Sequence, residues 1–346
     1  MARGGRREGQ RGRRATDDDF RRGPRPAAPP RGGVGMTGRR IAVIGSNNHD
    51  LVTYVTRMPV PGETVEAPGF EMGFGGKGAN QAMAAARLGA RVTMVTCVGD
   101  DMFGTATLAN FAQNGIDATH CRVVPGTPSG VAPIFVEPSG ENAILIVRGA
   151  NAALSPADID AAADDLAGCG LMLLQLEVPL ETVHHAVAFA ARHKITCILN
   201  PAPAMPLDFA RLAGLDYLVP NETELALLTG MPVETEDQIA AAARALIARG
   251  VRQVIVTLGG RGARLVTADA VQVIPPVAVT PVDTTGAGDA FIGSFAAFLA
   301  QGAAPEAALT RAARYAADSI TRRGAQKSYA SAADFARFEA EHEARP

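Results

Sequence analysis

A glycine-rich turn that carries a carboxylate is the stretch of this sequence best suited to chemistry. The tetrapeptide Gly-Ala-Gly-Asp at 286–289 precedes an apolar, alanine-rich run over 290–299 that is free of proline and long enough for a helix. A helix start presents unpaired N–H groups and the positive end of a dipole, and glycine lets an anion approach them. A carboxylate would repel a phosphate there, unless it takes a proton from a nucleophile beside it. The pattern predicts an anion-binding turn with a general base, as phosphoryl transfer to a hydroxyl requires.

A second glycine-rich turn, Gly-Phe-Gly-Gly-Lys-Gly-Ala-Asn at 73–80, stands before an alanine-rich helix predicted over 81–88. It is not a Walker phosphate loop, because Lys77 is followed by Gly-Ala-Asn rather than by Ser or Thr. Lys77 and Asn80 could both reach a polyhydroxylated ligand. Taken alone, the segment is also compatible with an ordinary turn.

Short apolar runs alternate with helical stretches over most of the chain. The runs at 40–44, 171–176, 195–199, 217–220 and 254–257 are typical of strands buried on both faces. Because strands that alternate with helices form βαβ units, we expect a mainly parallel sheet flanked by helices. Polar side chains follow these strands, at the edge where open α/β sheets bind ligands. They are Asn48, Asp50, Glu177, Asn200, Asn221, Glu224 and Thr257.

Two further segments, about 51–74 and 122–148, read as short antiparallel strands separated by turns. We expect them to form one small sheet beside the main domain. Such a sheet could act as a lid, or as an oligomer interface if its apolar face lacks cover.

Charge is unevenly distributed along the 346 residues. Residues 1–40 hold 12 arginines against 4 acidic residues, whereas the remainder holds 21 basic and 31 acidic residues. An acidic body is not a nucleic-acid-binding surface. Residues 1–38 are rich in Arg, Gly and Pro and poor in apolar residues, so we predict that they are disordered. The folded domain is predicted over 39–340.

No apolar run approaches the roughly 18–20 residues that span a bilayer, and no apolar core follows the N-terminal arginines as in a secretory signal. The four cysteines are widely spaced and lack the spacing of metal ligands, which favours free thiols in a reducing compartment. These features predict a cytoplasmic protein with no membrane partner.

The motifs together resemble the ribokinase family of sugar kinases. The resemblance covers about residues 40–335 and rests on Gly45-Ser46 with Asn48 and Asp50, Gly75-Gly-Lys-Gly-Ala-Asn80, Asn200-Pro-Ala-Pro203, Asn221-Glu-Thr-Glu224 and Asp283-Thr-Thr-Gly-Ala-Gly-Asp289. It implies a three-layer α/β sandwich with a mainly parallel central sheet flanked by helices, and a small β-sheet lid that builds a homodimer. It also implies ATP-dependent phosphorylation of a pentose at O5, with Mg²⁺ and with K⁺ as an activator.

The resemblance implies roles for individual residues. Asp289 would take the proton from the sugar hydroxyl, and the backbone N–H groups of Gly286, Ala287 and Gly288 would hold the γ-phosphate. The sugar would be bound by Asn48, Asp50, Gly76, Lys77, Gly78, Asn80 and Glu177, with Asp289. The nucleotide site would consist of Asn221, Thr257, Gly259, Gly260, Arg261 and Gly262, with Gly288 and Asp289.

Two cation sites are implied in the same way. Asn221 and Glu224 would order Mg²⁺ through water. K⁺ would be held, mostly by backbone carbonyls, at Asp283, Thr285, Ser319, Arg322, Gly324 and Ser328. The sequence departs from the family at Ala313, where an Asn or His side chain near the adenine is expected, which puts that contact in doubt.

The identity of the pentose depends on one amide. Segments 51–54, 130–135 and 176–178 also resemble the 2-deoxyribose kinase branch. A pocket amide left unpaired costs about 1–3 kcal/mol, so it should accompany a sugar that has a 2-hydroxyl. Asn48 keeps an amide at the position that resembles the C2 side of the sugar site. We therefore expect D-ribose as substrate and ribose 5-phosphate as product, with 2-deoxyribose as the alternative.

Other classes make different demands on the sequence. Asp289 could simply cap its helix, as Asp does well. A sugar or nucleotide sensor on the same fold would need no base at that position. A phosphosugar kinase would require more basic residues near the sugar than Lys77, and a nucleoside kinase would favour aromatic stacking. A Rossmann oxidoreductase would carry Gly-x-Gly-x-x-Gly after the first strand, which Gly45-Ser-Asn-Asn does not supply.

Overall fold

The computed structural model describes Met1, residues 38–139 and residues 141–343. The predicted disorder of residues 1–38 therefore lies almost wholly outside the described residues. Among these, no helix is both long and apolar enough to cross a membrane. The cytoplasmic location stays a prediction.

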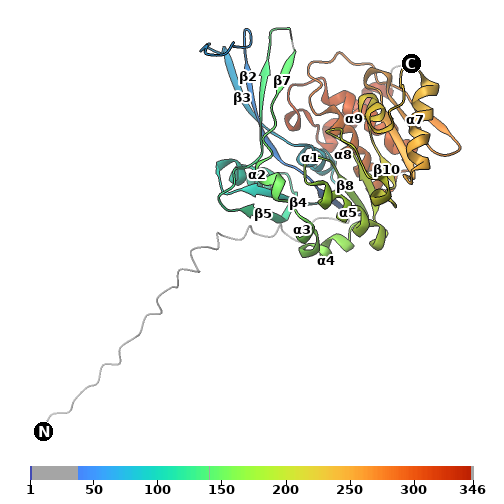
Figure 1. Cartoon of the computed structure of the whole chain (residues 1–346), viewed down its shortest axis with the longest axis horizontal. Coiled ribbons are helices and arrows are strands. Elements are labelled where there is room, and N and C mark those ends of the chain that lie inside the picture. The colour runs from blue at the N-terminus through green and yellow to red at the C-terminus, as the bar shows by residue number, and fades with distance from the viewer. Residues whose placement is uncertain (2–37, 140, 344–346) are drawn as a thin grey trace. The chain divides into compact units, whose positions relative to one another are not determined.

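A large, mainly parallel sheet forms the centre of the domain (Figure 1). Its strands β1, β4, β5 and β8–β11 run parallel, and β12 and β13 are added antiparallel at one edge. The order is β13 (Val271–Ile274), β12 (Ala263–Val266), β11 (Gln253–Thr257), β10 (Tyr217–Leu218), β9 (Thr196–Leu199), β8 (Leu171–Leu174), β1 (Ile41–Ile44), β4 (Val92–Gly99) and β5 (Asp117–Val124). The predicted sheet is thus confirmed.

Helices cover both faces of this sheet, because its central strands are apolar on both sides. In β1, Ala42 and Ile44 contribute to one hydrophobic core while Ile41 and Val43 contribute to the other. The first core includes residues of α3 (Pro156–Ala161), α4 (Ala163–Ala167), α5 (Leu180–His193), α6 (Glu222–Thr229) and α7 (Glu236–Ala248). The second includes residues of α1 (Lys77–Arg87), α2 (Met102–Gln113), α8 (Ala287–Ala300), α9 (Pro305–Ser319) and α10 (Ala332–Glu343).

A separate small sheet extends away from these layers (Figure 1). Its order is β3 (Gly69–Gly75), β2 (Asn48–Tyr54), β6 (Val131–Val136) and β7 (Asn142–Ile144). Only three residues, 45–47, separate β1 of the large sheet from β2 of the small one. The small sheet therefore joins the main domain right beside the ends of its parallel strands.

The bounds of the small sheet differ from those predicted. Residues 122–124 end β5 of the large sheet, residues 55–68 form no strand, and β2 already begins at Asn48 rather than at about residue 51. The pairing of β2 with β6 is parallel, not antiparallel. The difference arises because alternating short apolar runs are typical of either sheet, and only tertiary packing assigns β5 to the large one.

Candidate active site

Asp289 lies in the first turn of α8 and is buried. The helix begins after Gly286, whose φ of 75° places it in the left-handed region. A Cβ added to Gly286 would lie 2.7 Å from Tyr329 Oη and 2.8 Å from the Ala325 Cβ. Tyr329 Oη donates a hydrogen bond of 2.9 Å to the Gly286 carbonyl oxygen. Only glycine satisfies both the backbone angle and the close contact at this position.

The turn before α8 leaves several backbone donors open. Among the described residues, the N–H groups of Gly286, Gly288 and Asp289 find no acceptor, whereas the N–H of Ala287 reaches the Thr284 carbonyl oxygen at 3.2 Å. Unpaired N–H groups at a helix start attract anions. The turn therefore has the open donors that an anion site requires, with Asp289 at its end, and anion binding stays a prediction.

The Asp289 carboxylate is fixed by amide groups from α1. Asn80 Nδ2 donates to Asp289 Oδ2 at 3.0 Å, and Gln81 Nε2 donates to Oδ1 at 3.0 Å. Burial raises the pKa of Asp289, while the charge of Lys77 and the two amide hydrogen bonds oppose that rise. Neither contact is a helix cap, because a cap would accept from a backbone N–H of α8 and both donors are side-chain amides of α1.

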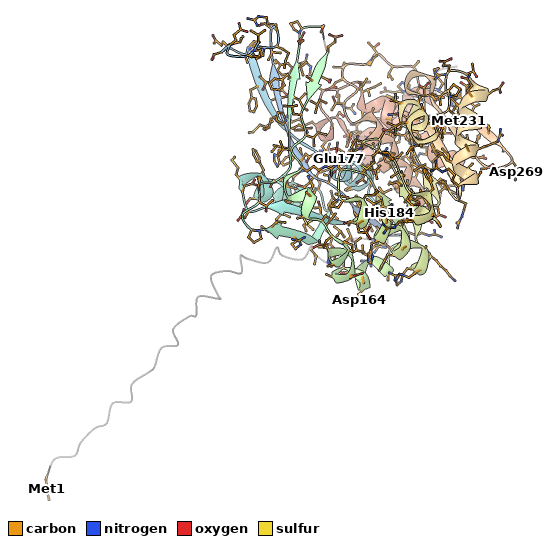
Figure 2. All side chains as sticks on the ribbon, in the orientation of Figure 1. Met1, Asp164, Glu177, His184, Met231 and Asp269 are labelled. Atoms are coloured by element: carbon orange, nitrogen blue, oxygen red, sulfur yellow. The ribbon has the colours of Figure 1, made fainter. Side chains whose placement is uncertain are left out.

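Two more carboxylates and one lysine lie close to Asp289. Glu177 Oε2 accepts from Ser46 Oγ at 2.5 Å and from the backbone N–H of Lys77 at 2.9 Å. Burial, followed by the charges of Glu177 and Asp289, raises the pKa of Asp50 to about 7. The charge of Asp289 raises the pKa of Lys77. Figure 2 shows Glu177 where the small sheet meets the layered part of the domain.

A cavity of about 230 Å³ opens against Asp289. Eight of its lining residues were predicted site residues, namely Lys77, Asn221, Glu224, Thr257, Gly286, Ala287, Gly288 and Asp289. Asn200, which the sequence placed on the same edge of the sheet, also lines it. The glycine-rich turn Gly259–Gly262 does not, and Arg261 there pairs with Glu222. The structure thus joins the anion turn to the ends of β9, β10 and β11.

Asn48 is buried at the start of β2, with its amide only partly used. Its Oδ1 accepts from Asn151 Nδ2 at 2.9 Å, and its Nδ2 has no acceptor among the described residues. Asn47 beside it donates to Thr96 Oγ1 and to the Cys97 carbonyl oxygen, each at 2.8 Å. Asn48 therefore retains a donor that a ligand could satisfy.

Asn221 and Glu224 form a reciprocal helix cap. Asn221 Oδ1 accepts from the Glu224 N–H at 2.8 Å, and Glu224 Oε2 accepts from the Asn221 N–H at 2.9 Å, which is a capping box at the start of α6. Burial raises the pKa of Glu224. Because the cap uses one oxygen of Glu224, the other carboxylate oxygen stays available at the cavity for a water-coordinated Mg²⁺.

The residues implied in K⁺ binding are brought together in part. Asp283 Oδ2 accepts from the Gly324 N–H at 2.8 Å, and Asp283 Oδ1 accepts from the Thr285 N–H at 2.9 Å. Arg322 donates to the Ser328 carbonyl oxygen at 2.7 and 3.0 Å, so this carbonyl is already engaged. A carboxylate beside backbone carbonyls suits a hard cation, so the residues fit on the Asp283 side and less well at Ser328.

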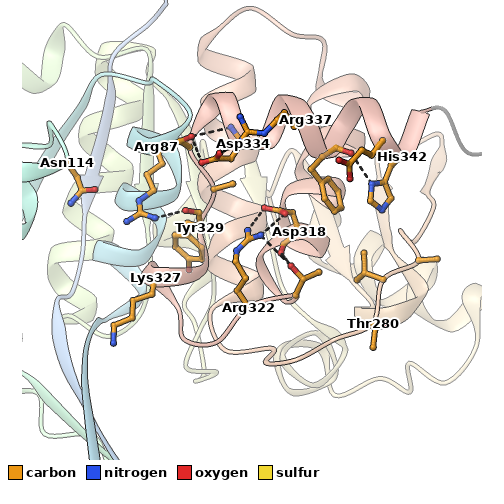
Figure 3. A pocket seen from close by; sticks show the side chains of 17 residues that line it. Arg87, Asn114, Thr280, Asp318, Arg322, Lys327, Tyr329, Asp334, Arg337 and His342 are labelled. Carbon is orange, nitrogen blue, oxygen red and sulfur yellow. Dashed lines mark hydrogen bonds and ion pairs between the residues drawn. The ribbon is translucent and has the colours of Figure 1, made fainter.

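A larger cavity, of about 1240 Å³, lies behind this loop. Figure 3 shows Arg322 paired with Asp318 on its wall, and Arg87 beside Tyr329. Arg87 Nη1 donates to the Tyr329 carbonyl oxygen, and Tyr329 in turn contacts Gly286. The wall of this cavity therefore supports the anion turn from behind.

The sequence interpretation missed three buried glutamines that surround the site. Gln81 contacts Asp289, Gln175 donates to Gln81 Oε1 at 2.7 Å, and Gln326 donates to Asn80 Oδ1 at 3.0 Å. Gln175 carried a usable signal, because it interrupts an otherwise apolar strand. Gln81 and Gln326 carried none, since nothing in the spacing distinguishes them from surface glutamines.

A parallel sheet whose strand ends meet a turn with open N–H groups, a buried carboxylate and a lysine is an arrangement suited to phosphoryl transfer to a hydroxyl. A profile of the pfkB family carbohydrate kinases matches residues 39–332. The chain belongs to the pfkB family of carbohydrate kinases.

Individual relatives agree with this assignment. The chain is 54% identical over 296 residues to a deoxyribokinase of Salmonella typhimurium, covering 85% of this chain and 97% of that protein. It is 43% identical over 288 residues to the ribokinase of Bacillus subtilis, covering 83% and 95%. The solved Arabidopsis thaliana ribokinase, in complex with ribose and ATP, superposes with a TM-score of 0.83 at 32% identity, covering 87% of this chain and 99% of that one. These relatives agree with a carbohydrate kinase of the pfkB family.

Proposed function

We propose that the protein transfers the γ-phosphoryl group of ATP to the 5-hydroxyl of D-ribose. The observation that carries the proposal is the buried Asp289 carboxylate at the end of a turn with three open N–H groups. The sugar hydroxyl oxygen attacks the γ-phosphorus, the bond to the bridging oxygen of ADP breaks, and Asp289 takes the hydroxyl proton. The open N–H groups would hold the phosphoryl oxygens as charge moves onto them.

The remaining residues of the cavity suit the nucleotide end of the reaction. Asn221, Glu224 and Thr257 line the same cavity as Asp289. When bound, Mg²⁺ would neutralise charge on the β- and γ-phosphates, and Asn221 and Glu224 are the residues that would hold it through water. Lys77 would balance the charge between sugar and phosphate, since it lines the same cavity.

The free Nδ2 of Asn48 supports ribose as the sugar. The protein supplies no acceptor for this donor among the described residues, and a 2-hydroxyl would supply one. A specific observation favours 2-deoxyribose as the second candidate: the identity to the Salmonella deoxyribokinase, at 54%, exceeds that to the Bacillus ribokinase, at 43%. The two candidates differ only at C2, and Asn48 is the residue that we propose for the C2 side of the sugar.

We expect kcat/KM for ribose to exceed that for 2-deoxyribose, measured by ADP release. Asn48→Leu, which keeps the size of the side chain and removes the donor, should lower kcat/KM for ribose by roughly tenfold, as expected for one hydrogen bond. The value for 2-deoxyribose should change less. A higher wild-type kcat/KM for 2-deoxyribose would assign the second candidate instead and leave the kinase chemistry untouched.

A monovalent cation at Asp283 would stabilise the turn that ends in Gly286. Asp283 already ties this turn to the loop at Gly324. We expect replacement of K⁺ by tetramethylammonium to lower kcat about tenfold, because an ångström-scale shift of the phosphate donors is costly. Faster amide exchange across residues 283–288 in the same buffer should accompany the loss. Equal kcat in both buffers would contradict the proposed cation site.

The small sheet supports a homodimer. Phe70 and Met72 of β3 and Ile144 to Ile146 around β7 are exposed apolar side chains, which a monomer would leave in water. We expect light scattering to give about twice the chain mass of 35.8 kDa, and Phe70→Glu to shift the population toward monomer. A wild-type protein of single-chain mass at assay concentration would exclude this interface.

A further inference from the structure

We propose that Gln81 and Gln175 are a pair of positioning residues that hold the Asp289 carboxylate in its reactive orientation. The inference rests on the proposed function, in which Asp289 is the general base. Both glutamines are almost wholly buried, and both lie deeper than the proposed sugar ligands Asn48 and Asn80. The pair would therefore act on the reaction through the groups that Gln81 contacts, and the closer of these in the cavity is Asp289.

Gln81 uses every hydrogen-bonding group of its amide inside the protein. Its Nε2 donates to Asp289 Oδ1 at 3.0 Å and to Asn200 Oδ1 at 3.4 Å, and its Oε1 accepts from Gln175 Nε2 at 2.7 Å. The side chain is wholly buried. An amide whose hydrogen-bonding groups are all used is held in one rotamer. It also holds the Asp289 carboxylate, which it contacts, in one orientation.

The packing of two helices sets the distance between Gln81 and Asp289. α8 approaches α1 at Gly293, where an added Cβ would lie 2.4 Å from the Gln81 carbonyl oxygen and 2.8 Å from the Ala84 Cβ. The two backbones are therefore as close as glycine allows. The amide and the carboxylate face each other across this close contact.

The direction of each amide follows from the charge of Asp289. An ionised carboxylate can only accept, so Gln81 must present Nε2 to it. If the Gln81 amide turned over, two oxygens would face each other and the Asp289 charge would lose its donor. Gln175 prevents this, because its Nε2 donates to Gln81 Oε1 and makes the turned-over amide unfavourable at both ends.

Gln175 performs this task at a cost. Its own Oε1 is buried and has no hydrogen-bond partner among the described residues. The surrounding run Leu171–Leu176 is otherwise apolar, so leucine at 175 would match its neighbours and leave no orphaned oxygen. A buried polar group that the fold would do better without indicates a functional constraint.

The second carboxylate oxygen of Asp289, Oδ2, is held by a similar pair of amides, but substitution of that pair would be a less specific test. Asn80 Nδ2 donates to Asp289 Oδ2, and Gln326 donates to Asn80 Oδ1. Asn80 is also a proposed sugar ligand, so its substitution would change binding and positioning together. Gln81 and Gln175 separate the two effects.

The test measures kcat, KM and the acid limb of the pH profile of kcat for Gln81→Leu, Gln175→Leu and the double variant. We expect Gln81→Leu to lower kcat about 10- to 100-fold, the range for ångström-scale misplacement of a reacting group, with KM for the sugar within threefold of wild type. The acid limb should move to higher pH, because loss of a donor to the charged carboxylate favours its protonated form. Gln175→Leu should move both quantities in the same direction by less.

The double variant shows whether Gln175 acts through Gln81. We expect it to be no slower than Gln81→Leu alone, since coupled residues are not additive. Gln301→Leu is the matched control, because Gln301 donates to the Leu88 carbonyl oxygen beyond the far end of α1 and is exposed. It should leave kcat and the acid limb unchanged.

Two outcomes would overturn the inference while leaving the proposed function intact. One is a Gln81→Leu enzyme with kcat within twofold of wild type and an unmoved acid limb, beside an inactive Asp289→Asn enzyme. The other is a double variant whose loss is the product of the two single losses. If Gln81→Leu does not fold, Gln175→Leu decides: a shifted acid limb supports the pair, and an unshifted one rejects it. An active Asp289→Asn enzyme would reject the proposed function itself.

Discussion

Replacing Asp289 by asparagine should lower kcat by at least about 10²-fold, since general-base catalysis typically contributes 10²–10⁴. Asparagine has nearly the shape of aspartate, so the turn and the cavity should survive. It cannot take a proton, and its amide would confront the donors Asn80 Nδ2 and Gln81 Nε2. Sugar-dependent ADP release measures the effect, and a direct binding measurement should show that the pentose still binds.

Asp269→Asn provides the matched control for the loss of one carboxylate. Asp269 is exposed between β12 and β13, away from the cavity (Figure 2). We expect its kcat to equal that of the wild type. If the Asp289→Asn enzyme keeps its kcat within about tenfold, the carboxylate caps its helix and is not the general base. That result would favour a sugar or nucleotide sensor on the same fold.

The second large effect is expected for Gly286→Ala. The added methyl group would collide with Tyr329 Oη and the Ala325 Cβ while forcing an L-residue to a φ of 75°. The turn must shift, and its open N–H groups shift with it. Loss of one such donor typically costs about 10²–10³ in kcat, so we expect a fall of that order with ATP binding reduced less.

Gly302→Ala is the control that separates the effect of a positive φ from the effect of a steric clash. Gly302 has a φ of 93°, and an added Cβ there would meet nothing within 4 Å. It should therefore lower the free energy of unfolding slightly, by about 1 kcal/mol, and leave kcat unchanged. If Gly286→Ala retains kcat within threefold, the donors of this turn do not stabilise the transition state.

Much of the fold follows from sequence because its central strands are short and apolar on both faces. The alternation of such runs with helices leaves few arrangements other than a parallel sheet, and the polar residues at Asn200, Asn221 and Thr257 then have to lie at one edge. The approach of Asn221 to Thr257 as neighbours across β10 and β11 confirms this placement. The two glycine-rich turns before α1 and α8 could also be predicted, because glycine followed by an alanine-rich run is typical of a turn that opens a helix.

The contacts around Asp289 could not be predicted in the same way. Gln81 lies 208 positions from Asp289 in the chain, and Gln175 lies 94 from Gln81, so their meeting depends on how α1, α8 and β8 pack. Side-chain amides give no periodic signal. The prediction that residues 122–124 belong to the small sheet was wrong for a related reason, since strand propensity does not say which sheet a strand joins.

The short connection between the two sheets has a mechanical consequence. Because residues 45–47 join β1 to β2 directly, any rotation of the small sheet about this connection would use β2 as a lever that starts at Asn48. At about 3.3 Å per residue its tip at Tyr54 lies about 20 Å from that connection, whereas Asp50 lies within about 7 Å. A rotation of the small sheet would thus sweep its outer end through a wide arc while displacing Asn48 and Asp50 very little. Such a rotation would change access to the site while leaving the positions of its polar groups on β2 nearly unchanged.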